Sequence, residues 1–331
     1  MDSYRRSLRI GAAFLLCAVV LKLGSMGLPQ KLTSLLQNPD ILSFLIYLET
    51  GRNVRFSPSS EEKSNFAGES PPPAAEIPEN PALPVFHPED AQVVEVYNLS
   101  GLTPDMAALI AQPLQWQLRS AEPTVLIIHT HATESYTKHN ENYTESSAFR
   151  TLDEHYNMIS IGDRVAEILS SNGIAVLHDR DLHDYPSYNG SYEDAREAIE
   201  EYLRRYPSIR LVLDLHRDAS GDLNNQFRPV VDVNGVPTAQ LMLVMGTDAS
   251  GQSHPRWQEN LALGLKLHVT LEQQASGIMR SLCLRSQRFN QDMTTGSLLI
   301  EVGAAGNSHE EALRAAEQLA YAIVTLAAGS E

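Results

Sequence analysis

Histidines and acidic residues follow three apolar stretches of this chain. The segment VLIIHTHATESY carries His129, His131 and Glu134 directly after four apolar residues. The segment LVLDLHRD ends a similar apolar run in His216, and LLIEVG contains Glu301. A charged group inside an apolar run is costly to bury without a partner. These side chains are therefore candidates for a site where chemistry takes place.

The residue types fit a metal-dependent hydrolase. In open α/β sheets, ligands bind beyond the carboxyl ends of the strands, so parallel strands would bring all three groups to one edge. Two imidazoles and a carboxylate, with a fourth position open, hold catalytic zinc. Glu301 would remain as an unligated general base. A single histidine at a strand end is more often a simple hydrogen-bonded residue, so the prediction depends on the combination. Asp214 is a competing carboxylate or a group that orients an imidazole.

The elements that must position these residues alternate between strand and helix, which predicts an α/β three-layer sandwich around a mostly parallel central sheet. Ser191 and Ser308 are expected to cap two of the helices, and Gly173 to end another. Expected strands cover residues 91–100, 124–131, 174–179, 209–219, 238–246 and 296–307, and expected helices cover residues 158–173, 191–207, 254–274 and 308–329.

The N-terminal part reads as a membrane anchor and a tether. Three arginines precede the apolar stretch at residues 10–28, which predicts a single span with the N-terminus in the cytoplasm and the body outside. Pro, Ser and Glu then dominate residues 57–89, a composition typical of disordered linkers. The predicted organisation is a cytoplasmic N-terminus at 1–9, an anchor at 10–28, a juxtamembrane segment and linker at 29–91, and a catalytic domain at 92–331.

Net charge and cysteine content argue against a nucleic-acid-binding protein and against a zinc site made of cysteines. The 331 residues carry a formal net charge of −16, which opposes binding to nucleic acid. The two cysteines, Cys17 and Cys283, are far apart in the sequence and too few for a thiolate zinc cluster. We predict no disulfide, and any zinc must be held by histidine and carboxylate.

Four motifs, HTHATESY, DLHRDA, RFNQDMTTGSLLIEVG and FLIYLETG, together resemble the stage II sporulation protein P family, SpoIIP. The resemblance covers nearly the whole chain. That family is similar to zinc-dependent N-acetylmuramoyl-L-alanine amidases, which implies cleavage of the amide between the glycan lactyl group and the stem peptide of peptidoglycan. Cleavage of cross-links between stem peptides is also credited to the family. The implied role is wall remodelling during engulfment, with the partners SpoIID and SpoIIM.

The resemblance also implies roles for individual residues. His216 in DLHRDA matches a zinc ligand, Glu301 matches the catalytic glutamate of the last strand, and His131 is favoured over His129 as the first ligand. The carboxylate ligand stays open. Glu134 is ranked first because His131-x-x-Glu134 looks like the zinc pair of carboxypeptidases, and Asp153 is ranked second because amidases take a Glu just before their first long helix.

Several polar residues are candidates for binding the substrate. Arg217 or Arg228 could hold a stem-peptide carboxylate in a bidentate manner, although a surface ion pair explains either equally well. Asp218 beside Arg217 belongs to the same group. Asn290 and Gln291 precede the last strand and could bond peptide or sugar amides. Two rival functions remain: a zinc carboxypeptidase that uses the same site, and a scaffold that binds the wall without catalysis.

Overall fold

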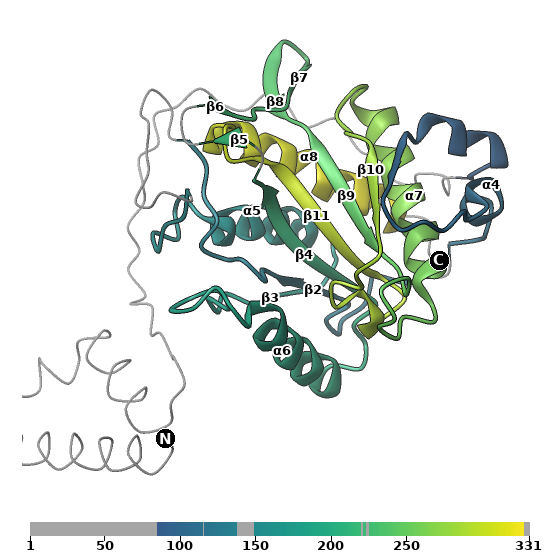
Figure 1. Ribbon diagram of the computed structural model, residues 1–331, viewed down its shortest axis with the longest axis horizontal. Coiled ribbons are helices and arrows are strands. Elements are labelled where there is room, and N and C mark those ends of the chain that lie inside the picture. The colour runs from purple at the N-terminus through teal and green to yellow at the C-terminus, as the bar shows by residue number, and fades with distance from the viewer. Residues whose placement is uncertain (1–84, 115, 138–148, 220, 223–224, 328–331) are drawn as a thin grey trace, which may run out of the picture. The chain divides into compact units, whose positions relative to one another are not determined.

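The structure is a computed structural model that describes residues 85–114, 116–137, 149–219, 221–222 and 225–327 (Figure 1). All of them belong to the unit formed by residues 77–331. The predicted anchor and most of the predicted linker lie outside the described residues. Within the described part, no helix is both long enough and apolar enough to cross a bilayer.

A seven-stranded mixed sheet forms the centre of the domain. In sheet order the strands are β1 (Val96–Asn98), β10 (Leu282–Arg285), β9 (Leu241–Gly246), β11 (Ser297–Ala304), β4 (Leu211–Asp218), β2 (Val125–Ile128) and β3 (Val176–His178). Only β9 and β11 pair antiparallel, and every other neighbouring pair is parallel. The expected mostly parallel sheet is therefore confirmed, with β1, β9 and β10 running against the other four strands.

Helices cover the two faces of this sheet unequally. The helices are α4 (Met106–Ile110), α5 (Met158–Ser171), α6 (Ser191–Arg205), α7 (Trp257–Gln274) and α8 (His309–Ala327), with 3-10 turns η1 (Pro88–Val93) and η2 (Gln291–Met293). Helices α5, α7 and α8 pack together on one face, called here the helix-covered face, whereas α6 packs against β2 on the other, the site face (Figure 1).

The site face is covered by a helix only in part. Residues of α6 bury Leu126, Ile128 and Val212 of β2 and β4. Val244, Cys283 and Leu299 form a separate small cluster. Met242 and Phe289 pack against this cluster. Three layers are thus present over β2 and β4, while a loop takes the place of a helix over β9 and β10.

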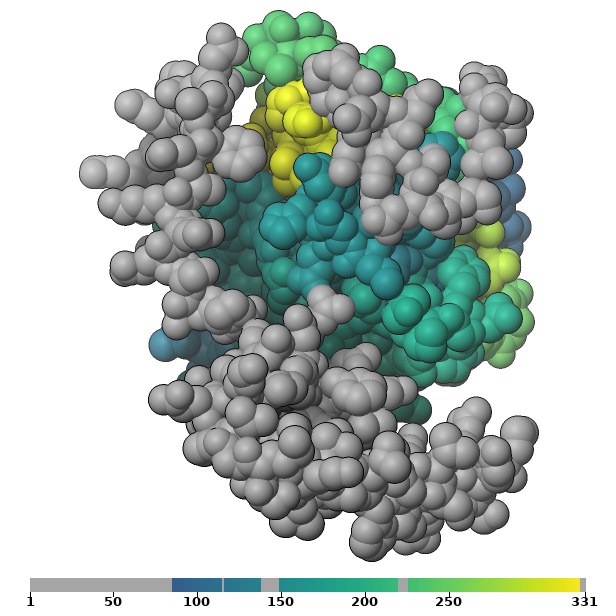
Figure 2. Space-filling model, turned by 90° about the vertical axis from the view of Figure 1, so that its left-hand side faces the viewer, coloured from purple at the N-terminus to yellow at the C-terminus, as the bar shows by residue number. Residues whose placement is uncertain are grey.

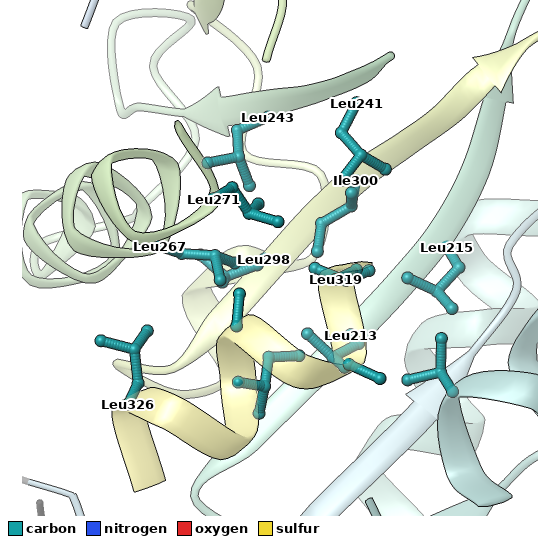
Figure 3. Close-up of a cluster of buried hydrophobic side chains, with 14 of the residues drawn as sticks. Leu213, Leu215, Leu241, Leu243, Leu267, Leu271, Leu298, Ile300, Leu319 and Leu326 are labelled. Atoms are coloured by element: carbon teal, nitrogen blue, oxygen red, sulfur yellow. The ribbon is translucent and has the colours of Figure 1, made fainter. Parts of the chain in front are cut away.

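The main core lies between the helix-covered face and its three helices (Figure 3). Leu213 of β4 and Leu298 and Ile300 of β11 point toward α7 and α8, and all are at most 2% exposed. Each such side chain contributes about 1.5–3 kcal/mol when fully buried. This apolar layer fixes the register of the strands, because a slip by one residue would turn it to the other face.

Two hairpins extend the sheet region. Strands β5 (Gly221–Asp222) and β6 (Asn225–Gln226) follow β4, and β7 (Val230–Val233) and β8 (Val236–Ala239) precede β9. Asn234 and Gly235 join β7 to β8 with positive φ at both positions. A two-residue Asn-Gly turn of this kind matches the twist of the flanking strands.

Candidate active site

On the face opposite the leucine layer, β4 and β11 carry polar side chains toward their carboxyl ends, after the apolar Val212 and Leu299. Glu301 pairs in register with His216, and Leu299 with Asp214. Because side chains alternate between faces along a strand, Asp214, His216 and Glu301 share the site face. The parallel register therefore brings His216 and Glu301, which lie 85 residues apart in sequence, next to each other.

A bulge interrupts the pairing of β11 with β4 just after Glu301, and pairing resumes at Ala304 and Asp218. The register of β11 against β4 shifts between Glu301 and Ala304, and Gly303 adopts a φ of 70°. A Cβ at Gly303 would lie 2.8 Å from Oδ1 of Asn307 and 2.9 Å from Cβ of Ala239. Only glycine fits this turn, which separates Glu301 from the start of α8.

His131 approaches the same place from the loop after β2. Its ring centroid lies 5.1 Å from that of His216, with the two rings nearly perpendicular. Tyr188 stacks on the ring of His131 at 4.6 Å, and Tyr192 makes an edge contact at 5.6 Å. The Oγ of Ser191 lies 3.3 Å from Nδ1 of His131. The imidazole is therefore held between the start of α6 and His216.

This use of Ser191 corrects the predicted helix cap. Gly190 occupies the N-cap position of α6 with a φ of 96°, and no side chain caps the helix. Ser308, in contrast, accepts a hydrogen bond from the backbone N–H of Glu311 at 3.2 Å, as predicted. The contact with His131 takes the Ser191 hydroxyl away from the helix end, which the local sequence does not show.

Glu134 is buried between two arginines and His216. Its Oε2 accepts the backbone N–H of Arg217 at 3.2 Å and lies 3.7 Å from Nδ1 of His216. Its Oε1 accepts a hydrogen bond from Arg150 at 3.3 Å. Burial alone would raise the pKa of Glu134, but Arg217, His216 and His131 hold it below the usual value. Glu134 is therefore a charged carboxylate with one oxygen directed at His216.

Asp214 lies against the other side of the His216 ring. Its Oδ1 is 2.9 Å from Nε2 of His216, and it accepts hydrogen bonds from the backbone N–H and hydroxyl of Thr130. Although burial opposes its charge, His216 and Thr130 lower the pKa of Asp214 to about 2. Burial also disfavours a charged His216, but Asp214, Glu134 and Glu301 raise its pKa to about 10. His216 thus stands among acids that favour a positive charge at its position.

Within the described part of the chain, Glu301 has fewer hydrogen-bond partners than Glu134 or Asp214. Its Oε2 is buried and has no hydrogen-bond partner among the described residues. Burial, together with the negative charges of Glu134 and Asp218, raises the pKa of Glu301 to about 8 despite the opposing effect of His216. A carboxyl group that exchanges its proton near neutral pH has the property required of a general acid or base.

The structure places the two alternative ligands elsewhere. His129 is fully buried, donates from Nδ1 to the carbonyl of Leu215 at 3.0 Å, and contacts Nε2 of His178 at 2.8 Å. The carboxylate of Asp153 accepts hydrogen bonds from the ring and backbone of His155 near the surface. The geometry therefore brings together His131, Glu134, His216 and Glu301, and leaves His129 and Asp153 with other partners.

Two predicted substrate-binding residues have structural contacts instead. The guanidinium of Arg217 is buried and donates to the carbonyls of Ser135 and Phe149 at 3.0 and 2.8 Å. It therefore braces the segment that carries Glu134. Asp218 forms an ion pair with Arg280 at 2.8 Å, beside the candidate site.

Arg228, Asn290 and Gln291 also have protein partners. Arg228 pairs with Glu311 in the first turn of α8. The side chain of Gln291 bonds both the N–H of Gly246 and the carbonyl of Val244, so its amide holds a loop against β9. Asn290 donates to the carbonyl of Tyr192 at 2.8 Å. Each of these side chains therefore has a structural contact within the protein.

Sequence reasoning missed the residues that surround His131 and Glu134. Arg150 bonds Glu134 and Asp184, and its guanidinium lies 4.8 Å from the centre of the Tyr188 ring. Asp184 in turn accepts hydrogen bonds from the backbone and hydroxyl of Thr133. Figure 2 shows the side of the molecule on which the segment between β3 and α6 lies. Its tyrosine-rich sequence, HDYPSYNGSY, directly before a helix was the available signal.

The donor set fits a divalent metal ion by type and approximate spacing. Two tetrahedral zinc ligands, each about 2.1 Å from the metal, are about 3.4 Å apart, and Nδ1 of His216 lies 3.7 Å from Oε2 of Glu134. Three buried acids around His216 also favour a cation. No three His, Cys, Asp or Glu side chains in the described part of the chain are already arranged around one point as metal ligands. His131, whose ring centroid lies 5.1 Å from that of His216, is the remaining candidate ligand.

Comparison with known proteins identifies the family. The family model of stage II sporulation protein P matches residues 53–324. The chain belongs to the SpoIIP family. A curated member from Bacillus subtilis (strain 168) is 26% identical over 215 residues, which cover 62% of this chain and 51% of that protein. The chain thus spans about half the length of the curated SpoIIP protein that it matches.

Solved amidase structures show a distant likeness to this SpoIIP chain. An N-acetylmuramoyl-L-alanine amidase from Clostridium difficile 630 aligns with 62% of this chain and 94% of its own, at 17% identity and a TM-score of 0.37. The CwlD amidase from Clostridioides difficile, solved with the GerS lipoprotein, aligns with 61% and 94%, at 14% identity and a TM-score of 0.35. At this level the likeness says nothing about the activity of this chain.

Proposed function

We propose that the chain is a zinc-dependent N-acetylmuramoyl-L-alanine amidase that cuts peptidoglycan during sporulation. The observation that carries the proposal is Glu301, a half-buried residue whose Oε2 is buried without a hydrogen-bond partner among the described residues, with a pKa of about 8, beside the imidazole of His216. Membership of the SpoIIP family supports the sporulation role. In this proposal His131, Glu134 and His216 hold the metal, which when bound supplies Lewis-acid polarisation of the substrate carbonyl.

Glu301 moves the protons of the hydrolysis. It takes a proton from the attacking water as the water oxygen bonds to the amide carbon. It then gives that proton to the amide nitrogen as the carbon–nitrogen bond breaks. The products are a lactyl carboxylic acid and a peptide amine, and the acid passes its proton to the amine, which leaves a carboxylate and an ammonium group. The raised pKa of Glu301 makes its carboxylate a stronger base than an ordinary glutamate, while its acid form can still donate a proton near neutral pH.

The neighbours of the ligands orient them for this reaction. Asp214 fixes the ring of His216, since its own carboxylate is held by both donors of Thr130. Arg150 and the N–H of Arg217 hold the two oxygens of Glu134 in different directions. Partners of this kind set the ring orientation and basicity of metal ligands.

The setting of the enzyme is part of the same proposal. An N-terminal single-pass anchor would hold the catalytic domain on the outer side of the cell membrane, where stem peptides are accessible. SpoIID-like and SpoIIM-like proteins would be partners, and cross-links between stem peptides would be a second class of substrate. The arginines before residues 10–28 and the family membership support this placement.

Digestion of purified sacculi by the full-length chain with added zinc tests the proposal. Cleavage must release stem peptides with new amino termini and leave lactyl carboxylates on the glycan. Glu301→Gln should retain zinc and lose about 10²- to 10⁴-fold of the rate, the usual contribution of a general acid or base. Glu122→Gln, at an exposed position, is the matched control.

Two outcomes would contradict the proposal. Release of free terminal amino acids in place of whole stem peptides would show a carboxypeptidase, which the His131-x-x-Glu134 pair would equally serve. Mass spectrometry should find one zinc per chain in the wild type and less in His216→Ala. No bound metal and no cleavage would leave a scaffold that binds the wall.

A further inference from the structure

A groove with a volume of about 490 Å³ lies on the part of the sheet that α6 leaves uncovered. It crosses the beginnings of β9, β10 and β1. Its lining includes Met242, Arg280, Tyr97 and Glu95. None of these residues takes part in the mechanism above.

The groove begins at the candidate active site. Met242 pairs in register with Glu301 across β9 and β11. Arg280 forms its ion pair with Asp218, two residues beyond His216 on β4. A substrate whose amide lies at Glu301 would therefore meet the groove directly beside the bond that is cut.

Charges are arranged at both ends of the groove. Arg280 is the only basic residue of the lining, and its guanidinium lies 4.8 Å from the centre of the Phe227 ring. Only its Nη1 approaches a carboxylate, so among the described residues Nε and Nη2 have no protein partner. Glu95 lies on the other side, where its Oε2 accepts a hydrogen bond from Ser281 at 2.9 Å. This order suits a ligand with a carboxylate near the site and an amino group further along.

The dimensions suit a short extended peptide. From β11 through β9 and β10 to β1 there are three strand spacings of about 4.8 Å, or about 14 Å, which about four residues span at roughly 3.3 Å each. Tyr97 offers an aromatic ring that is 60% exposed, and Met242 and Met279 provide adaptable apolar surface. An exposed ring beside a polar groove is a common anchor for a ligand.

We propose that this groove binds the peptide part of the substrate. On this assignment, which rests on the proposed function, the stem peptide runs from Glu301 across β9 and β10 to Tyr97. Arg280 binds a carboxylate close to the cut amide, and Glu95 binds an amino group about 14 Å away. The specificity for peptide length then comes from the uncovered half of the sheet, separate from the metal ligands.

Kinetics of the full-length chain on two soluble substrates test the assignment. One substrate is an N-acetylmuramoyl dipeptide and the other an N-acetylmuramoyl tetrapeptide that ends with a diamino acid and a further residue. Tyr97→Ala and Glu95→Gln should raise KM for the tetrapeptide about tenfold, the effect of losing about 1.4 kcal/mol, with kcat unchanged. Neither variant should change the kinetics of the dipeptide by more than about twofold, because the dipeptide ends before Tyr97.

Matched variants separate binding from folding. Leu99→Ala is the control for Tyr97→Ala, because Leu99 is also exposed and lies just after β1 but does not line the groove. It should behave as wild type on both substrates. Arg280→Gln should raise KM for both substrates, since the carboxylate it binds is present in each. Equal effects of Tyr97→Ala on the two substrates, or no effect on either, would overturn the assignment while leaving the amidase proposal intact.

A direct titration covers the case in which the wild type cleaves neither substrate. The proposed function would then be wrong, and the free tetrapeptide is titrated into the full-length chain by calorimetry. Saturable binding that weakens about tenfold in Tyr97→Ala would still support the groove. Absence of saturable binding, or equal binding by both proteins, would overturn it.

Discussion

The two faces of β4 and β11 show how the same strands serve two purposes. On the helix-covered face Leu213, Leu298 and Ile300 pack against α7 and α8 with at most 2% exposure (Figure 3). On the site face the alternating positions hold His216 and Glu301. The first face is stabilised by burial alone, whereas the second buries charges that oppose one another. The apolar core and the candidate site thus lie on opposite sides of a single sheet.

The contrast has an energetic reason. The strands can hold acids in costly positions because the other half of their side chains supplies a large apolar core. Glu301 remains without a partner for Oε2 among the described residues, and its raised pKa measures that cost. Variants on the two faces should therefore change stability in opposite directions.

The largest expected effect is on the helix-covered face. Leu298→Ala should lower the free energy of unfolding by about 2–5 kcal/mol, because the removed atoms leave a cavity between β11, α7 and α8. Urea denaturation of the full-length chain measures this change. Val93→Ala, at an exposed position, is the control. If Leu298→Ala lowers the free energy of unfolding by less than about 1 kcal/mol, the comparison between the two faces is wrong.

Glu301→Gln should raise the free energy of unfolding. The measurement is made with a chelator present, so that bound metal does not contribute. Between pH 4.5 and about 8 the unfolded chain releases the proton of Glu301 while the folded chain keeps it, so wild-type stability falls as pH rises. The variant does not titrate, and its advantage should grow from near zero at pH 4.5 to about 5 kcal/mol above pH 8. Melting curves across this range provide the measurement. A variant that is less stable at every pH would show that Glu301 supports the fold.

Lys266 tests whether a buried charge on the helix side carries a similar cost. It is 2% exposed on α7, and its Nζ makes long contacts of 3.4 and 3.5 Å with two backbone carbonyls and lies 5.6 Å from the centre of the Phe86 ring. Burial lowers its pKa from 10.5 to about 8. The folded chain therefore releases this proton at lower pH than the unfolded chain, and wild-type stability rises between pH 8 and 10.5.

Lys266→Met should accordingly stabilise the chain by about 3 kcal/mol at pH 7, and the gain should vanish by about pH 10.5. Chemical denaturation at both pH values measures it, with no expected change in the rate of wall digestion. A gain that does not depend on pH would indicate better packing of methionine as its cause.

Gly162→Ala should have the smallest effect and sharpens the role of His129. A Cβ there would lie 2.5 Å from Nε2 of His129 and 2.4 Å from Nε2 of His178. We expect a loss of about 1–2 kcal/mol and a weaker bond from His129 to the Leu215 carbonyl, which precedes His216. The reaction rate should fall with little change in KM. Gly264→Ala on α7, whose Cβ would meet only the flexible side chain of Met245, is the control.

Local patterns were enough to predict most of the regular elements. The apolar runs predicted β2, β4, β9 and β11, and the helical spacing predicted α5 to α8. Two signals were overlooked: the Asn234-Gly235 turn of the β7–β8 hairpin and the short strand β10, whose four residues give too little periodicity. The reversed direction of β9, β10 and β1 follows from pairing between distant segments, which no local pattern contains.

The sequence by itself determined which residues are available for chemistry: apolar runs that end in His131, His216 and Glu301, and membership of a family with a recognisable set of motifs. Only the tertiary structure decided which candidates meet. It places Glu134 beside His216 and pairs His129 with the carbonyl of Leu215. It also shows that Arg217 and Gln291 form hydrogen bonds with the backbone of the protein. The physical reason is that alternation along a strand fixes the face of each side chain, whereas its partners depend on the register of strands far apart in the chain.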